Sequence, residues 1–343
     1  MRFAGFVVNL CPRMENAELA VIINSFNRLA LFRQSLSTLV SSLNRSGVPT
    51  AIIVFDAGSN DGTVEWLRQE QQRQPIPIIL LLPEPGEPTS FSHGVNRGAS
   101  HAVAVCPRLR HLFLYETDNC LMSAQPLLAA RELLKRSPHL AACGFTVRKH
   151  DGSAAGVGDQ FPTLKTFLLG QQVSFLLQRE GTPPADPTAP FVLPVVYTSP
   201  LLIKADAWQR VGGFDEATFP FSECDVDLAY RLRQLGLQMA VLPTRDVIHD
   251  NQQQKSEWSA TRSLKFYQAR YRFFLKHRPL AARLSKPLLI LMHLVELLLL
   301  AILVLGRKRK RQAVATRWLL AKSVLNNYEV RGEELGHPQI SAD

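Results

Sequence analysis

The stretch IIVFDAGSNDGT, at residues 52–63, joins an apolar run to the start of a helical pattern. The apolar run ends on Asp56, small polar residues follow, and amphipathic spacing begins at Val64. Strand, polar turn and helix in this order form the repeating unit of α/β folds. The stretch therefore predicts that a carboxylate stands at the carboxyl end of a buried strand.

The same unit recurs along the first 250 residues. The apolar runs LAVIINSF, IPIILLLP and HLFLYETD are followed by the amphipathic stretches ALFRQSLSTLVSSLNRSG, SHGVNRGASHAV and AQPLLAARELLKRSP. Short strands without polar alternation are buried on both faces, which is typical of parallel sheets with right-handed helical crossovers. We predict an α/β fold, with a mostly parallel sheet flanked by helices and a ligand site at the carboxyl ends of its strands.

Three of these strands are predicted to end on polar residues. The first is followed by residues 24–28, the second ends on Asp56 and a later one ends on Asp118. A single carboxylate could simply cap the next helix, and we expect Asp61 to do so. Three polar strand ends together favour a site for a nucleotide and its phosphates, with SHGVNRGAS as a helix start between them. Neither glycine pattern is a GxGxxG fingerprint or a phosphate loop, which argues against a dinucleotide oxidoreductase and a P-loop ATPase.

The composition of the chain indicates the cellular compartment in which it folds. The chain has 343 residues, 46% of them hydrophobic, and five scattered cysteines without a CxxC pair. This usage fits a reducing compartment and argues against a structural zinc site. The start, MRFAGFVVNLCPRM, is a poor signal peptide, so we expect the catalytic part to stay in the cytosol.

The positive charge is concentrated late in the chain. The net charge is +10, and the excess lies in YQARYRFFLKHRPLAARLSK and RKRKRQ, on either side of an apolar segment. Basic clusters beside an apolar helix favour an anionic membrane surface over nucleic acid as the partner. A solvated basic tail is the alternative.

The apolar segment runs from Pro287 to Leu305 and is interrupted only by His293 and Glu296. At 1.5 Å per residue it is roughly 28 Å long, just enough to cross a bilayer core. Basic residues on both sides conflict with the positive-inside tendency of a single span. We favour a helix in the interface or a re-entrant pair at the cytoplasmic face, with His293 and Glu296 turned to water or to each other. A single span and a dimer interface stay open.

Several stretches together resemble a known family. AVIINSFNRLALFRQSLSTL, IIVFDAGSNDGTVEWL, NRGASHAV and LYETD, in this order, resemble the nucleotide-binding half of family 2 glycosyltransferases with the GT-A fold. TSPLLIKADAWQRVGGFDE, CDVDLAYRLRQLG and VLPTRDVIHD resemble the acceptor-side strand, the Glu-Asp motif and the terminal histidine of that family. The resemblance implies an N-terminal extension at 1–18, a GT-A domain at 19–255 with halves at 19–120 and 121–255, and a helical region at 256–343.

The resemblance also implies roles for individual residues. Asp56 matches the aspartate that recognises a uracil or thymine base, and Asp225 matches the general base. Asp118 matches the last acidic residue of an Asp-x-Asp metal motif, with Glu116 in its first position, and His249 matches a histidine that completes the metal or diphosphate site. The cofactor would be Mg²⁺ or Mn²⁺, which suits a diphosphate leaving group. Further residues expected at the nucleotide are Asn24, Phe26, Arg28, Ser59, Asp61 and Arg97.

One position departs from the family pattern. Where the family has Glu-Asp, this chain has Cys224-Asp225, and Glu223 is displaced by one residue. The base is retained, but the acceptor identity is put in doubt. Asp227 is expected to cap the helix that follows. His249 has a second interpretation as a strand-end histidine with a structural hydrogen bond.

These features predict an inverting, metal-dependent glycosyltransferase. It would move one sugar, rhamnosyl or hexosyl, from a UDP- or dTDP-sugar to a membrane-associated acceptor, a lipid-linked saccharide. One alternative is a membrane-attached sugar or polysaccharide binder that kept the fold and lost the chemistry. Another is a nucleotidyltransferase, but that class predicts a phosphate-binding group of basic residues near the first strand, and Arg28 alone is too little for that.

Overall fold

The protein is described from a computed structural model, which covers residues 14–169, 189–250, 260–303 and 311–329. Residues 1–13 of the predicted extension, 304–305 of the apolar segment and 307–310 of the basic run lie outside the described residues. The strands are β1 Leu19–Ser25, β2 Thr50–Asp56, β3 Ile78–Leu81, β4 His111–Tyr115, β5 Asn119–Leu121, β6 Leu140–Phe145, β7 Gly158–Asp159, β8 Phe191–Leu193, β9 Val195–Val196, β10 Leu201–Lys204, β11 Gln238–Leu242 and β12 Val247–His249. The helices are α1 Leu29–Ser46, α2 Thr63–Arg73, α3 Phe91–Val105, α4 Gln125–Arg136, α5 Leu164–Leu168, α7 Ala205–Val211, α8 Cys224–Gln234, α9 Ala260–His277, α10 Pro279–Leu284, α11 Lys286–Leu303 and α12 Arg311–Ser323.

The central sheet has eight strands in the order β3-β2-β1-β4-β10-β6-β11-β8. Strands β3, β2, β1 and β4 run parallel to one another, and β6 and β11 run in the same direction as these four. Strand β10 runs the opposite way between β4 and β6, and β8 is antiparallel to β11. The predicted mostly parallel sheet is therefore confirmed, and its two reversed strands both belong to the second half of the chain.

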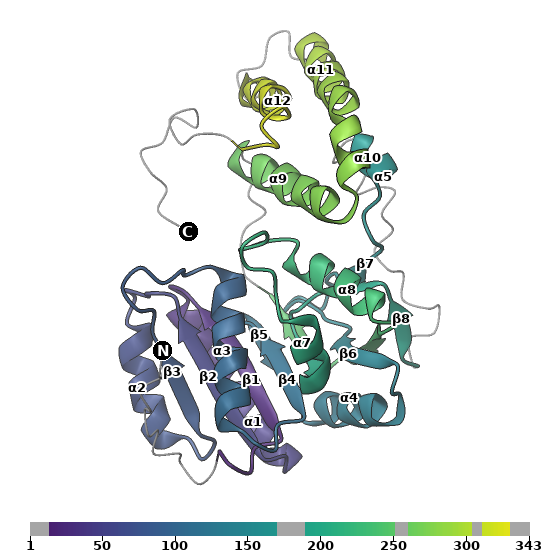
Figure 1. The fold of residues 1–343 in the computed structure, drawn as a ribbon. Helices are drawn as coiled ribbons and strands as arrows, with labels where there is room; N and C mark the ends of the chain where they lie inside the picture. Colours follow the sequence, from purple (N-terminus) through teal and green to yellow (C-terminus); the bar gives the residue numbers. More distant parts are fainter. Residues whose placement is uncertain (1–13, 170–188, 251–259, 304–310, 330–343) are drawn as a thin grey trace, which may run out of the picture.

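Both faces of the sheet are buried, as the uninterrupted apolar strands predict. In β1, Leu19, Val21 and Ile23 pack into the core that also holds side chains of α1, α2 and α4. The alternate residues Ala20 and Ile22 pack into the core shared with α3, α7 and α8. The sheet thus lies between two layers of helices (Figure 1).

The carboxyl ends of β1, β2 and β4 meet at one edge of the sheet. Ser25 pairs with Asp56 across β1 and β2, and Ile23 pairs with Tyr115 across β1 and β4. A separate two-stranded ribbon of β5 and β12 pairs His249 with Asn119. This ribbon returns the end of the second half of the chain to the polar end of β4.

Helix α3 approaches this edge closely because its first turn carries glycine. A Cβ atom on Gly94 would lie 1.9 Å from Oδ1 of Asn24 and 2.7 Å from the Phe55 ring. Both distances are too short for any residue with a side chain unless the neighbouring atoms move. Ser90 caps the helix by accepting a hydrogen bond from the backbone N–H of His93. The glycine-bordered helix start is therefore needed for close packing of α3 against β1 and β2.

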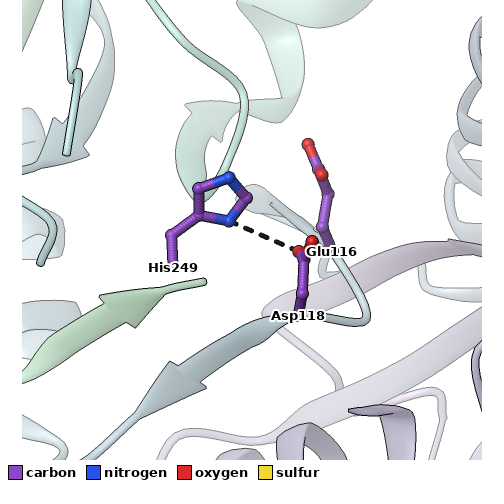
Figure 2. Close-up of side chains that lie close together, drawn as sticks. All are labelled: Glu116, Asp118 and His249. Carbon is purple, nitrogen blue, oxygen red and sulfur yellow. Dashed lines mark ion pairs between the residues drawn. The ribbon is translucent and has the colours of Figure 1, made fainter. Parts of the chain in front are cut away.

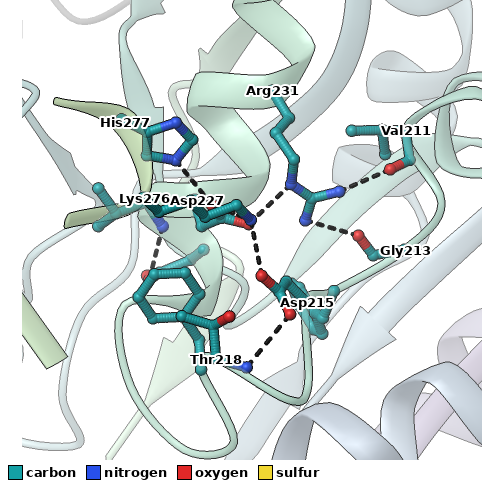
Figure 3. Close-up of polar contacts among 12 residues, drawn as sticks. Val211, Gly213, Asp215, Thr218, Asp227, Arg231, Lys276 and His277 are labelled. Carbon is teal, nitrogen blue, oxygen red and sulfur yellow. Dashed lines mark hydrogen bonds and ion pairs between the residues drawn. The ribbon is translucent and has the colours of Figure 1, made fainter. Parts of the chain in front are cut away.

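Asp227 holds α8 and α9 together, and the prediction that it caps α8 is wrong. Its carboxylate is fully buried and accepts a hydrogen bond of 2.7 Å from Nε of Arg231. Its other oxygen lies 2.7 Å from Nζ of Lys276 and 2.8 Å from Nε2 of His277, both on α9 (Figure 3). Two cations, Arg231 and Lys276, and the His277 imidazole are available as partners, so the carboxylate binds them instead of the backbone at the helix start.

The C-terminal helices form a group at one end of the molecule, with α9 nearest to the sheet domain (Figure 1). In the described part of the chain, no helix combines the length and the apolar character needed to cross a bilayer. In α11, His293 is buried, with Nδ1 3.5 Å from Oε2 of Glu296 and Nε2 2.9 Å from the Tyr328 hydroxyl. Nε of Arg317 lies 3.2 Å from the same Glu296 oxygen. The sequence leaves His293 and Glu296 turned to water or to each other, and the structure shows the second arrangement.

Candidate active site

The Asp56 carboxylate organises the loop that follows β2. Oδ1 accepts hydrogen bonds from the backbone N–H groups of Gly58, at 3.1 Å, and Ser59, at 2.7 Å. Oδ2 accepts a third, of 2.7 Å, from the Ser59 hydroxyl, and the side chain is fully buried. A buried strand can therefore end on a carboxylate because the next turn supplies three donors to it.

The loops after β1 and β2 are joined by further side chains. The Ser59 hydroxyl accepts a bond of 2.8 Å from the backbone N–H of Asn27. Asp61 accepts bonds from the backbone N–H groups of Leu29, at 2.9 Å, and Thr63, at 3.2 Å, the first residues of α1 and α2. Burial opposes ionisation, but these bonds hold the pKa of Asp61 below its ordinary value. Asp61 thus stabilises the starts of α1 and α2. Its predicted contact with the helix that follows it is present, although Gly62 occupies the N-cap position of α2.

Glu116, Asp118 and His249 form a compact cluster at the end of β4 (Figure 2). Each offers one ligand atom, and these atoms lie within 4.8 Å of one another. Nδ1 of His249 is 3.3 Å from Oδ1 of Asp118 and 2.9 Å from Oδ1 of Asn119. The pairing of β12 with β5 creates this cluster, because it sets His249 opposite the residue that follows Asp118.

The cluster has an excess of negative charge. Burial, then the neighbouring Asp118 carboxylate, raises the pKa of Glu116 to about 7. Burial alone would lower the pKa of His249, but the Asp118 and Glu116 carboxylates raise it above its ordinary value. The Asp118 carboxylate contributes to both shifts, so the cluster favours an added proton or cation.

These residues fit a divalent cation. Oδ1 of Asp118 is buried, and the described residues give it no hydrogen-bond partner. Carboxylate oxygens are the usual ligands of Mg²⁺ and Mn²⁺, and one or two protein ligands suffice where phosphates supply the rest. Nη1 of Arg28 lies 3.8 Å from Oδ2 of Asp118, so a cation from the loop after β1 also faces the cluster.

A cavity of about 580 Å³ connects the cluster to the start of α8. Glu116, His249 and Asp225 are among the residues that line it. Helix α9 adds Phe266 and Arg270. The cavity therefore brings two members of the cluster, Glu116 and His249, and the predicted base Asp225 to one space, while Asp118 is not among the lining residues. It also takes two side chains from the region C-terminal to residue 255.

Asp225 is held in the first turn of α8. Oδ1 accepts a hydrogen bond of 2.9 Å from the backbone N–H of Val226. Burial, then the nearby Glu223 carboxylate, raises the pKa of Asp225 to about 6. A carboxylate with such a pKa can accept a proton near neutral pH, as a general base must.

Residues 16–270 match the family described as "Glycosyltransferase like family 2". The chain belongs to this family. Its GT-A fold also agrees with a solved structure, the mannosyltransferase PcManGT from Pyrobaculum calidifontis in complex with GDP-Man and Mn²⁺. The TM-score is 0.54 at 16% identity, over 93% of this chain and 89% of that one.

Two curated relatives give a more specific likeness. The chain is 28% identical over 211 residues to the N-acetylglucosaminyl-diphospho-decaprenol L-rhamnosyltransferase of Mycobacterium tuberculosis, strains CDC 1551 and H37Rv. The match covers 59% of this chain and 66% of the relative, so the chain spans just under two thirds of the relatives' length.

The structure places the other predicted nucleotide residues of this glycosyltransferase around the strand ends but outside the cavity. Asn24 lies on β1, where the described residues leave its buried Oδ1 without a hydrogen-bond partner. Phe26 follows β1 and is partly exposed. Arg97 lies on α3 and donates a hydrogen bond of 2.9 Å to Glu87. Of the nucleotide residues, Arg28 is the one that the described contacts connect to the acidic cluster.

Sequence reasoning missed Arg270 and Phe266. Both lie on α9, whose stretch YQARYRFFLKHR was interpreted only through its charge. Helical spacing puts the two residues four apart on one face, but nothing local shows that this face lines the cavity.

Proposed function

We propose that this glycosyltransferase is an inverting, metal-dependent enzyme that transfers one sugar from a UDP- or dTDP-sugar to a lipid-linked saccharide. The observation that carries the proposal is that one cavity is lined by Glu116 and His249 and also by Asp225. A donor diphosphate beside the cluster and an acceptor hydroxyl beside Asp225 would meet in this space.

Asp118, with Glu116 and His249, would hold Mg²⁺ or Mn²⁺. The ion would neutralise charge on the departing diphosphate when bound. Arg28, close to Asp118, is placed to contribute a second positive charge to the same phosphates. The protein's part in donor activation is therefore electrostatic, and it comes from the ends of β1 and β4.

Asp225 would accept the proton of the attacking hydroxyl. Its raised pKa of about 6 leaves it ionised at neutral pH but a stronger base than an ordinary aspartate. A base opposite the leaving group supports a single displacement, which inverts the anomeric carbon.

Asp56 would select the base of the nucleotide. A carboxylate has about four acceptor positions, and three are used by Gly58 and Ser59. The fourth can accept from the ring imide of uracil or thymine. Because Asp56 is fully buried, we expect the Ser59 loop to shift when the base binds. Asn24, Phe26, Ser59, Asp61 and Arg97 are proposed to shape the same nucleotide site.

The acceptor is proposed to lie at a membrane surface, at its cytoplasmic face. The curated relatives are named for a lipid-linked N-acetylglucosamine acceptor. In this chain, α10 and α11 expose a row of large apolar side chains: Leu280, Leu284, Leu288, Leu291, Val295 and Leu298. An amphipathic surface of this kind can lie in the bilayer interface without crossing it.

Calorimetry tests the donor site directly. We expect UDP or dTDP to bind only with Mn²⁺ present, and GDP and CDP to bind more weakly. Asp118→Asn should weaken the metal-dependent binding, whereas Asp151→Asn, in an exposed turn, should leave it unchanged. A folded wild-type protein that binds no nucleotide would contradict the proposal and favour a non-catalytic sugar binder.

A further inference from the structure

Glu223 occupies a strained backbone position beside the proposed base. It is the N-cap residue of α8 and has φ 63°, in the left-handed region that few residues other than glycine adopt. Backbone strain of this kind persists where surrounding contacts hold it, and it is frequent at functional sites. The strained turn places the Glu223 carboxylate, together with Asp225, among the side chains that line the cavity.

Arg270 holds this carboxylate from α9. Its Nη2 donates a hydrogen bond of 2.9 Å to Oε1 of Glu223, and its guanidinium lies 5.2 Å from the centre of the Phe266 ring. Arg270 is only 8% exposed, although it lines the cavity. The pair therefore has a fixed geometry before any ligand binds.

Each partner keeps one unused polar atom. Within the described residues, Nε of Arg270 and Oε2 of Glu223 are buried and have no hydrogen-bond partner. Unpaired buried donors and acceptors destabilise the folded state. A donor and an acceptor left unpaired on the same ion pair indicate a ligand that supplies both kinds of group.

The charge of the cavity decides which ligand chemistry fits. Among the described residues, its lining includes the carboxylates of Glu116, Asp159, Glu223 and Asp225, the imidazole of His249 and one guanidinium, that of Arg270. Beside Glu223 and Asp225, an anion without a bound metal ion would be repelled by these carboxylates, whereas the donor diphosphate is proposed to lie with its metal ion at the cluster of Glu116, Asp118 and His249. A sugar hydroxyl is neutral and both donates and accepts hydrogen bonds, and the aromatic ring of Phe266 offers an apolar surface to a pyranose.

We propose that Glu223 and Arg270 form the acceptor-sugar subsite, in which Oε2 of Glu223 accepts from one hydroxyl and Nε of Arg270 donates to a neighbouring oxygen. The subsite fixes the acceptor so that a further hydroxyl reaches Asp225. This inference rests on the proposed function. Glu223 and Arg270 then determine which acceptor sugar is used, while the strand-end residues determine the donor.

The test uses the isosteric variant Glu223→Gln and the charge-retaining variant Arg270→Lys in the full chain. Transfer is measured with sugars activated by the nucleotide that the binding series selects. The acceptors are decyl glycosides of common hexoses, in uncharged parent and monodeoxy forms and in a form that carries a phosphate. Glu18→Gln is the matched control, because Glu18 pairs with Arg131 at 2.8 Å and neither residue lines the cavity.

We expect Glu223→Gln to lower kcat/KM for the parent acceptor by about 10- to 100-fold, with unchanged affinity for the nucleotide and Mn²⁺. With wild type, one monodeoxy acceptor should show the same loss of kcat/KM relative to the parent acceptor. For this acceptor, Glu223→Gln should cause no further loss of kcat/KM. Arg270→Lys should show the same pattern of kcat/KM values with the monodeoxy acceptor that lacks a neighbouring oxygen of the sugar.

Two results would overturn the subsite. One is an equal loss on the parent and on all monodeoxy acceptors, which would mean that the pair acts only through Asp225. The other is an Arg270→Lys loss confined to an acceptor that carries a phosphate, which would indicate anion binding. In both cases wild type still binds nucleotide and transfers sugar, whereas failure of the proposed function would appear as no nucleotide binding by wild type.

Discussion

At the scale of single residues, Asp225 links the electrostatics of the site to its chemistry. Burial and Glu223 raise its pKa to about 6, so the base is protonated in acid and ionised near neutrality. We expect kcat/KM to rise with pH and to level off above about pH 6. Asp225→Asn should lower transfer by about 10²- to 10⁴-fold and leave nucleotide binding intact. If the residual kcat/KM of Asp225→Asn still rose with pH in the same acidic range, a group other than Asp225 would be the base.

The same pKa makes Asp225 a destabilising residue. Its folded-state pKa of about 6 is above the ordinary 3.8, so ionisation disfavours the folded state as the pH rises through this range. The penalty is about 3 kcal/mol at high pH and vanishes below the ordinary pKa. We expect Asp225→Asn to raise the free energy of unfolding by about 1–3 kcal/mol near pH 8 and by little near pH 4. Urea unfolding at the two pH values measures this, and a gain independent of pH would refute the charge explanation.

At the scale of elements, the buried Asp227 network joins α8 to α9. Removing the charge of Asp227 leaves Arg231, Lys276 and His277 without their shared anion (Figure 3). We expect Asp227→Asn to lower the free energy of unfolding by about 3–5 kcal/mol. The control is Glu132→Gln, whose pair with Arg136 is largely exposed, with an expected change under about 0.5 kcal/mol. Equal effects of the two variants in urea unfolding would contradict a structural role for this network.

Elements that depend on a short stretch of sequence can be predicted, whereas elements that depend on contacts between distant residues cannot. The strands and their polar ends follow from short apolar runs, so the parallel part of the sheet and the Glu116–Asp118 strand end could be predicted. The reversal of β10 could not, because its direction is set by pairing with β4 and β6. Asp227 was predicted as a cap because its partners on α9 are 49 and 50 residues away in the chain. Arg270 was missed for the same reason.

At the scale of the whole molecule, charge and apolar surface are gathered in the C-terminal helices. Residues 260–329 contain fifteen lysines and arginines but only two acidic residues, whereas the whole chain has a net charge of +10. The exposed row on α10 and α11 follows the three- and four-residue spacing of one helical face. The positive charge of this part of the chain is complementary to anionic lipid and opposes association of two copies.

We therefore expect the protein to co-sediment with vesicles that contain phosphatidylglycerol, and less so with neutral vesicles or at high salt. Leu284 and Leu291 are 70% and 57% exposed, so replacing both with Glu removes apolar contact without disturbing the core. Each buried leucine contributes about 1.5–3 kcal/mol, so the double variant should bind vesicles at least about 100-fold more weakly. Leu82→Glu, at an exposed leucine after β3, is the control. If the double variant bound vesicles normally but dissociated a dimer in sedimentation velocity, the row would be a subunit interface, and the acceptor would have to reach the cavity by another route.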